Sequence, residues 1–397
     1  MIKSDKIKDI FLQNKDDIAF IIGNGIHYQY KDCSITWNEL LESLWLKYTG
    51  ENKSVPDGIT TTEFYDIIEL CLYSKNLIIP NCKEDVHPEC TLRDLKNIDR
   101  DELSNYLLKS IKNEINAGLS KYDNKDEYNN KYQHFISSCR RFCEQNFEEE
   151  KNLSNEECVN LMISTLSNGT KRQILNGSIK KTVADKFEEK KTYNLYKCIA
   201  SLQKLNTPIL TTNFDTYISD SIGAKRYILK PKEGQYKFTD FYPWNMYYCD
   251  KEIQNPLEKF AVWHINGTKE YSRSIRLGLS DYMGSVERAR KMVQGNNLNE
   301  YFTGKNQSYW AGYNTWLHIM FNKSLFIFGL GLEENEVFLR WLLIQRAKYS
   351  RMYNRPLHGW YVGKDIKPGK EFFLEQLGFE VLKISDYNIL YQTLETL

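Results

Sequence analysis

The sequence lacks an excess of charge of either sign. Its 397 residues carry 53 Lys and Arg against 52 Asp and Glu, which gives a formal net charge of +1. Affinity for nucleic acids and other polyanions needs clustered cations that acidic neighbours do not compensate. The balance therefore argues against a dedicated nucleic-acid-binding protein.

Long apolar runs are also missing. The longest stretches, such as residues 324–332, are about half of the roughly 20 residues that a membrane-spanning helix requires. The N-terminus leads into mixed charges, with no apolar signal core and no small-residue cleavage site. We therefore expect a cytoplasmic protein without a membrane segment.

The nine cysteines form no CxxC pair, and their odd number is spread along the chain. Cys139 and Cys143 stand one helical turn apart, and Cys82, His87 and Cys90 are near neighbours. Neither group supplies a convincing four-ligand zinc set. We expect reduced thiols and no metal, which again fits the cytoplasm.

Internal repeats, low-complexity tracts and a Walker phosphate-binding motif are absent as well. Any ATPase activity would therefore have to come from another protein. What is present is a composition of 41% apolar and 14% aromatic residues, which is too rich in core-forming side chains for a disordered chain. A globular fold follows.

Six apolar runs are typical of buried parallel strands. They are residues 18–22, 209–212, 260–265, 324–328, 360–362 and 380–384. The fourth run passes through Gly329-Leu330-Gly331 into a helical pattern whose apolar side chains share one side. Strand, glycine turn and helix in that order predict an α/β fold, a Rossmann-like parallel sheet of about six strands.

Residues 38–204 differ from the rest of the chain, because they are charged, poor in proline and glycine, and rich in amphipathic patterns. A helix is predicted to begin near Trp37, with apolar side chains at helical intervals over the next 11 residues. We expect three parts: residues 1–37 with the first strand and its glycine loop, a mostly helical insertion over 38–204, and the remainder of the sheet domain over 205–397.

Glycines follow two of the predicted strands. In Gly23-Asn24-Gly25 they would let backbone N–H groups approach a phosphate or ribose, and Gly329 and Gly331 allow the same interpretation. A plain tight turn explains each motif equally well. Two such turns together suit a ligand with two phosphate or ribose ends better than either alone.

Polar residues end two further strands. Thr211-Thr212-Asn213-Phe214-Asp215 would place Asn213 and Asp215 where open α/β sheets bind ligands, although a helix N-cap is the alternative. His264 ends its own strand and could act as a general base. The alternative is a hydrogen-bonded structural histidine.

In combination these motifs resemble the sirtuin-like NAD-consuming family, and more narrowly its bacterial branch found in anti-phage defence. The resemblance rests on the first glycine loop, Thr-Thr-Asn-Phe-Asp, His-Ile-Asn-Gly-Thr and the late Phe-Gly-Leu-Gly. It extends to Leu279-Ser280-Asp281-Tyr282 and to a closing strand, helix and strand near 360–384. It covers residues 16–37 and 205–390, which is about half of the chain.

The chain departs from the sirtuin deacylases in three respects. It has none of the CxxC pairs of their zinc module, and Ile26-His27-Tyr28 stands where they usually place a serine and an arginine. Its asparagine motif reads Thr-Asn-Phe-Asp instead of Gln-Asn-Ile-Asp. These departures argue against binding of an acyl-lysine peptide and leave an NAD pocket in place.

The resemblance implies an NAD+ hydrolase that releases nicotinamide and ADP-ribose as the toxic effector of abortive infection. We assign Asn213 to the ribose hydroxyls or the attacking water, Asp215 to the nicotinamide amide or the cationic sugar, and His264 to the base. The expected NAD-binding residues are Gly23, Asn24, Gly25 and Thr212 near the diphosphate and nicotinamide ribose, with Gly329 and Gly331 toward the adenosine. An NAD-dependent deacylase and a non-catalytic NAD or ADP-ribose sensor are the alternatives.

Free NAD hydrolysis would harm the cell that makes the enzyme, so some restraint is expected. The resemblance implies a homo-oligomer and a partner such as a HerA-type ATPase or an Argonaute. The helical insertion and the aromatic cluster over residues 241–248 are candidates for an interface or a pocket lid. Core packing is an equally good explanation of that cluster.

Overall fold

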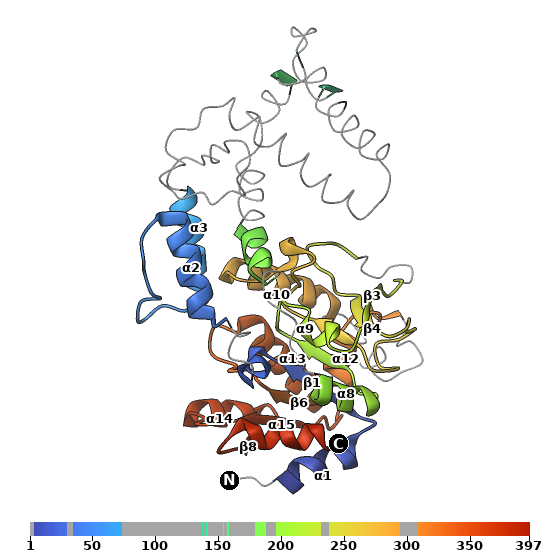
Figure 1. Cartoon of the computed structure of the whole chain (residues 1–397). Coiled ribbons are helices and arrows are strands. Elements are labelled where there is room, and N and C mark those ends of the chain that lie inside the picture. The colour runs from blue at the N-terminus through green and yellow to red at the C-terminus, as the bar shows by residue number, and fades with distance from the viewer. Residues whose placement is uncertain are drawn as a thin grey trace. The chain divides into compact units, whose positions relative to one another are not determined.

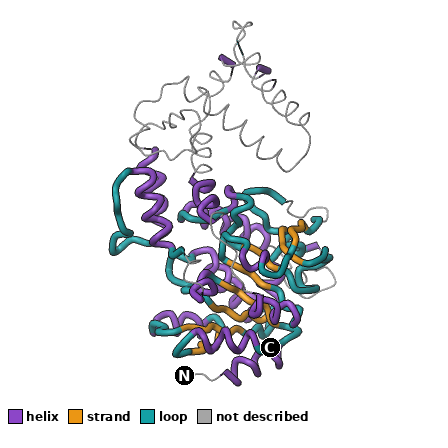
Figure 2. Tube along the Cα trace, viewed as in Figure 1, coloured by secondary structure: helices purple, strands orange, loops and turns teal. Residues whose placement is uncertain are grey.

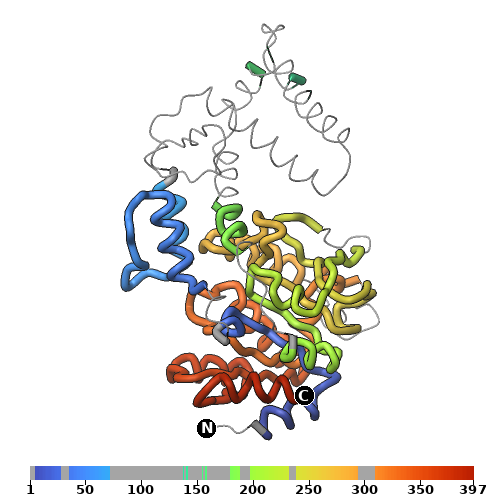
Figure 3. Tube along the Cα trace, viewed as in Figure 1, coloured from blue at the N-terminus to red at the C-terminus, as the bar shows by residue number. Residues whose placement is uncertain are grey.

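The computed structural model describes residues 4–29, 35–73, 137, 140–141, 154, 157–158, 179–187, 196–231, 238–293 and 309–397. The chain divides into two compact units. The first consists of Met1–Trp37, Thr60–Glu63 and Ile179–Leu397, and the second of Asn38–Ile59 and Phe64–Ser178. The colours of Figure 3 show that the N-terminal segment and the C-terminal half both build the first unit.

Strands and helices alternate along most of the first unit, except that β3, β4 and β5 follow one another directly; Figure 1 labels many of these elements. Its strands are β1 (Ile18–Ile22), β2 (Ile209–Thr211), β3 (Lys225–Ile228), β4 (Met246–Cys249), β5 (Val262–His264), β6 (Ser324–Phe328), β7 (Gly359–Gly363) and β8 (Phe379–Lys383). Its helices are α1 (Ser4–Asn14), η1 (Asn24–Gln29), α8 (Tyr196–Lys204), α9 (Tyr217–Asp220), η3 (Ser272–Ser274), α10 (Leu279–Val293), α12 (Leu317–Asn322), α13 (Val337–Met352), α14 (Pro368–Gln376) and α15 (Tyr387–Glu395). Residues 179–187 are also helical.

One sheet runs through this unit in the order β3-β4-β5-β2-β1-β6-β7-β8. The six strands from β5 to β8 in that order are parallel, whereas β3 and β4 are antiparallel at one edge. At the centre of the sheet, Phe20 of β1 is paired with Ile209 of β2 on one side and with Phe326 of β6 on the other. The prediction of a mostly parallel α/β sheet is confirmed, and its arrangement is compatible with a Rossmann-like fold.

The six predicted strands are all present, but the expected count was too low because β3 and β4 were missed. β3 is a charged, largely exposed edge strand, which gives no apolar signal. β4 begins inside the aromatic cluster over 241–248, and Tyr247 of this strand is buried with its ring centroid 5.0 Å from that of Trp263. Residues 246–248 of this cluster therefore pack in the core.

Helices cover both faces of the sheet, as Figure 2 shows by colour. On β1, Ile18, Phe20 and Ile22 pack with α1, α8 and α15, while Ala19 and Ile21 pack with α10, α12, α13 and α14. Every residue of β1 is buried. Burial on both faces explains why these strands read as continuous apolar runs in the sequence.

The strand order reverses between β1 and β6, because the chain runs outward from β1 through β2 and β5 on one side and from β6 through β7 and β8 on the other. The loops after β1 and β6 therefore meet at the carboxyl edge of the sheet. Open α/β sheets bind their ligands at such a switch point.

The second unit contains most of α2 (Trp37–Thr49) and α3 (Thr61–Tyr73). The predicted start of a helix near Trp37 is confirmed. The apolar side chains that recur at helical intervals after it are buried: Leu40, Leu41, Leu44, Trp45 and Tyr48. Most of the expected helical insertion lies outside the described residues. Residues 179–204, which were predicted to lie in that insertion, belong to the first of the two compact units. None of the helices in the described part of the chain is long and apolar enough to cross a membrane.

Candidate functional site

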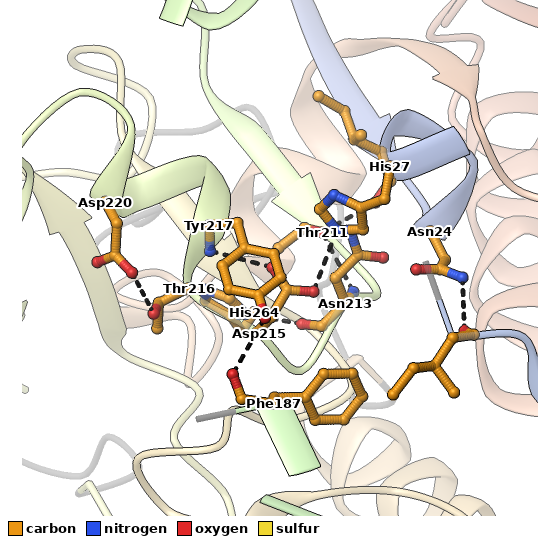
Figure 4. Close-up of polar contacts among 12 residues, drawn as sticks. Asn24, His27, Phe187, Thr211, Asn213, Asp215, Thr216, Tyr217, Asp220 and His264 are labelled. Atoms are coloured by element: carbon orange, nitrogen blue, oxygen red, sulfur yellow. Dashed lines mark hydrogen bonds and ion pairs between the residues drawn. The ribbon is translucent and has the colours of Figure 1, made fainter. Parts of the chain in front are cut away.

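Asn213 stands at the centre of a cluster of buried polar residues beyond the end of β2 (Figure 4). Its backbone N–H donates to the Thr211 hydroxyl oxygen at 3.1 Å, and that hydroxyl donates to the Ile22 carbonyl of β1 at 2.9 Å. The side chain of Thr211 thus ties the turn that carries Asn213 to the neighbouring strand.

His264 meets Asn213 from the end of β5. Its Nδ1 lies 2.8 Å from the Asn213 main-chain oxygen. A carbonyl only accepts, so Nδ1 carries the proton. Burial lowers the pKa of His264, and the ring is neutral at neutral pH. Its Nε2 is therefore a bare nitrogen, buried and without a hydrogen-bond partner among the described residues.

Asp215 carries the negative charge of the cluster. Its Oδ1 accepts from the Tyr217 N–H at 3.0 Å, and its Oδ2 lies 3.1 Å from His27 Nε2. Burial raises the pKa of this carboxyl, but His27 and the Tyr217 N–H favour the ionised form, and the pKa falls below its usual range. The bond from the Tyr217 N–H closes an Asx-type turn just before α9, whose N-cap is Thr216, so Asp215 is not the N-cap residue that the alternative proposed.

His27 was not among the residues predicted for the site. This residue lies in η1, is 1% exposed, and brings Nε2 within 3.0 Å of the Asn213 side-chain amide nitrogen as well as within reach of Asp215. A single histidine after a glycine loop belongs to no repeating pattern, so the sequence gives no sign that it is a site residue. Only the departure from the serine of deacylases at Ile26-His27 could have drawn attention to it.

The two glycine loops contact each other. Gly23 N–H donates to the Phe328 carbonyl at 3.1 Å, and Gly25 N–H donates to the Gly329 carbonyl at 2.7 Å. A Cβ on Gly23 would lie 2.5 Å from the Gly329 oxygen, and one on Gly25 would lie 2.7 Å from the Gly329 Cα. Close packing at the switch point thus requires these glycines, and their amide hydrogens are used in it instead of being open to a phosphate.

The other predicted binding residues lie along the same sheet edge. Thr212 is buried and donates its N–H to the Ile22 carbonyl at 3.2 Å. The side-chain nitrogen of Asn24 donates to the Ile35 carbonyl at 2.9 Å. Gly331 is exposed, and its carbonyl accepts from Lys370 Nζ at 2.8 Å.

A small cavity of about 10 Å³ lies beside His264, which is room for about one water molecule. Aromatic, hydroxyl and cationic side chains line it, among them Tyr242, Trp244, Ser285, Arg276 and Trp316. The rings of Trp244 and Trp316 stack with their centroids 5.0 Å apart. The cluster over 241–248 therefore contributes a wall of this cavity.

Asp281, from the Leu279-Ser280-Asp281-Tyr282 motif, supports that wall. Its Oδ1 lies 2.6 Å from Lys180 Nζ and 3.7 Å from Arg276 Nη1. Burial raises the pKa of Asp281, but the two cations outweigh burial and bring it below its usual range. The motif thus holds a guanidinium that lines the cavity.

Phe214, between Asn213 and Asp215, sits between two aromatic side chains. Its ring centroid lies 5.9 Å from that of Trp37 and 6.2 Å from that of Phe187. Trp37 immediately precedes the second unit in the sequence, and Phe187 lies in the helical residues 179–187, which follow that unit. Both stretches of chain that flank the second unit therefore pack against the loop after β2.

In the part of the chain that the structure describes, no three His, Cys, Asp or Glu side chains lie close enough together to hold a metal ion. The cysteines and histidine considered for zinc, Cys82, His87, Cys90, Cys139 and Cys143, lie outside the described residues.

The polar cluster around Asn213 combines a neutral imidazole, a carboxamide and an ionised carboxylate. These groups suit base catalysis next to a developing positive charge.

No protein-family model matches this chain, and no curated protein matches it either. The function is therefore inferred from the motifs and from the geometry of the site.

Proposed function

We propose that this chain is an NAD+ hydrolase of the sirtuin-like type, which cleaves NAD+ to nicotinamide and ADP-ribose. The observation that carries the proposal is the 2.8 Å bond between His264 Nδ1 and the Asn213 main-chain oxygen. It joins two of the motifs on which the resemblance rests, and it leaves the buried Nε2 of His264 unprotonated beside the Asn213 loop.

The reaction needs little acid catalysis, because nicotinamide leaves the ribose as a neutral molecule. As the bond between C1′ of the ribose and the nicotinamide nitrogen breaks, its electron pair goes to that nitrogen and the sugar becomes cationic. The oxygen of a water molecule then bonds to C1′, and its proton passes to His264 Nε2. Asn213 holds the ribose hydroxyls or this water in place.

Asp215 has a narrower role in this scheme. Its oxygens accept from His27 and from the Tyr217 N–H, and the residue is 3% exposed, so a direct bond to the nicotinamide amide would require the buried carboxylate to be uncovered. Its buried negative charge can support the cationic sugar without any such change. Electrostatic support is therefore the role we propose.

The glycine loops shape the proposed NAD site by their packing. Because Gly23 and Gly25 lie against Gly329, the two loops form one surface at the switch point instead of two separate cradles. Thr212 and Asn24 would border the nicotinamide ribose, and Gly331 would lie toward the adenosine.

The biological role that suits this activity is that of a toxic effector in anti-phage defence, restrained until it is triggered. We propose a homo-oligomer that works with a partner encoded alongside, such as a HerA-type ATPase. The support for this role is the resemblance in the motifs.

The test is to incubate the purified chain with NAD+, alone and with the protein encoded next to it, and to quantify nicotinamide and ADP-ribose. Asn213→Ala and His264→Ala should each lower the rate about a hundredfold or more. His318→Gln is the matched control, because His318 is equally buried and its Nδ1 also bonds a carbonyl, that of Tyr313. Unchanged rates in both site variants would refute the catalytic assignment, and release of nicotinamide only with an acylated peptide would identify a deacylase.

A further inference from the structure

His27 follows β1 in the chain, whereas its partners Asn213 and Asp215 follow β2. Its side chain extends from η1, after β1, to the loop after β2, where its partners lie 186 and 188 residues further along the chain. The exposed fractions of His27, Asn213 and Asp215 are 1%, 6% and 3%. Figure 4 shows the imidazole directed at both of the other side chains. Burial of three polar groups together requires that they satisfy one another.

The proton on His27 can be placed from its neighbours. An ionised carboxylate only accepts hydrogen bonds, and Asp215 Oδ2 lies 3.1 Å from Nε2. A bare Nε2 would set a lone pair against this negative charge in a buried site. Nε2 therefore carries a hydrogen and donates it to Asp215.

This proton also decides how the Asn213 amide is turned. A nitrogen that bears a hydrogen in the ring plane cannot accept from the Asn213 NH2 group at 3.0 Å. The amide oxygen can instead share the hydrogen of Nε2, after a half-turn that leaves the shape of the side chain unchanged. The NH2 group then occupies the other end of the amide, which is buried and has no hydrogen-bond partner among the residues described.

Asn213 is thus held at its side chain by His27 and at its main-chain oxygen by His264. We propose that His27 is a positioning residue, which presents the NH2 group of Asn213 to the substrate as a donor and keeps the Asp215 carboxylate beside it. This role rests on the proposed NAD+ cleavage. Its ligand-side consequence is specific: Asn213 donates to a ribose hydroxyl oxygen or a water oxygen.

Two substitutions separate positioning from packing. The amide nitrogen of glutamine reaches about as far as imidazole Nε2, whereas that of asparagine reaches only as far as Nδ1. His27→Gln keeps a donor for Asp215, and we expect its kcat to stay within about tenfold of the parent chain. His27→Asn loses that donor, and its kcat should fall about a hundredfold, with KM for NAD+ changed by less than about threefold because His27 contacts Asn213 and not NAD+.

The matched controls are His318→Gln and His318→Asn. His318 is 0% exposed and lies in α12, and its ring packs against those of Trp310 and Tyr313. These variants should lower Tm by about as much as those at His27 and leave kcat unchanged. If the Gln and Asn variants at His27 have equal kcat, or if those at His318 lower kcat to the same extent, the positioning role is wrong.

The outcomes also separate this proposal from the proposed function. A parent chain that releases no nicotinamide, alone or with its neighbour, overturns both. A parent chain that is active with His27 variants that behave like those at His318 overturns only the role of His27. If the His27 variants do not fold, ¹⁵N NMR of the histidine-labelled parent chain decides the matter, since a protonated Nε2 on His27 is required and a bare one refutes the proposal.

Discussion

His27 and His264 hold the same residue by two different groups. His27 Nε2 lies 3.0 Å from the Asn213 side-chain amide, and His264 Nδ1 lies 2.8 Å from the Asn213 main-chain oxygen. The two imidazoles come from the loop after β1 and from the end of β5, on either side of β2 in the sheet. The position of Asn213 is therefore fixed by all three strands together.

The first prediction concerns the pH dependence of the reaction. Burial lowers the pKa of His264 below its ordinary value of 6.5, so Nε2 is unprotonated at neutral pH and above. The kcat should stay level from neutral to mildly alkaline pH and fall only in acid, where Nε2 binds a proton. A pH profile of nicotinamide release tests this, and an acidic limb with its midpoint above neutrality would contradict it.

The second prediction concerns Asp215. In Asp215→Ala, His27 and the Tyr217 N–H lose a buried acceptor, and the free energy of unfolding should fall by about 3–5 kcal/mol. Asp215→Asn keeps an acceptor and should lose less, while its rate of NAD+ cleavage falls because the negative charge is gone. Urea unfolding and product assays measure the two effects. Asp9→Asn, at an exposed position on α1, is the control.

The same carboxylate gives stability a defined dependence on pH. Its pKa is lowered in the folded chain from an ordinary value of 3.8. The unfolded chain thus takes up this proton at higher pH than the folded chain does. The contribution of Asp215 to stability is fully present above that ordinary value and is lost as the pH falls through the lower, folded value. Asp215→Asn should lack this acid-dependent part, and an unchanged dependence would show that the carboxylate is not ionised in the fold.

The third prediction concerns the contact between the glycine loops. Gly25→Ala places a Cβ 2.7 Å from the Gly329 Cα and 2.8 Å from its oxygen, and backbone must move to relieve the overlap. We expect a loss of about 1–3 kcal/mol in the free energy of unfolding. Gly369→Ala, where no atom lies within 4 Å of the new Cβ, should stay within about 0.5 kcal/mol of the parent chain. Equal stability of the two variants would show that the loops are not packed as described.

The fourth prediction concerns Phe214, which packs between Trp37 and Phe187. Phe214→Leu loses both ring contacts next to Asn213 and Asp215, and kcat should fall about tenfold because small displacements of positioned groups slow reactions strongly. Phe372→Leu, at a position 64% exposed, should leave kcat and Tm unchanged. A Phe214→Leu variant with normal kcat would show that the aromatic contacts do not position the loop.

The parallel part of the sheet could be predicted because its strands are buried on both faces and therefore read as unbroken apolar runs. β3 escaped this criterion because an edge strand such as Lys225–Ile228 carries charge and has an exposed face. β4 is buried throughout, but it was interpreted only as part of the aromatic cluster over 241–248. Asn213 and Asp215 were identified because they follow such a run, and His264 was identified because it ends a strand of another run. Their positions at strand ends were visible in the sequence.

What could not be predicted depends on contacts between distant residues. The role of His27 appears only when the fold brings it to Asn213 and Asp215, 186 and 188 residues away. The glycines were interpreted as phosphate contacts, because nothing local shows that Gly25 lies against Gly329. Sequence patterns report burial and turns well, and they do not report which buried groups become partners.

The most direct test of the account is a crystal structure of the His264→Ala variant with NAD+, in which the slowed reaction preserves the substrate. We predict that the nicotinamide ribose lies within hydrogen-bond distance of the Asn213 side chain, with C1′ facing the position that His264 Nε2 occupies in the parent chain. An NAD+ molecule bound with its nicotinamide ribose away from Asn213 would contradict the account. A crystal soaked with NAD+ in which the contact between the loops after β1 and β6 leaves no room for the molecule would contradict the account as well.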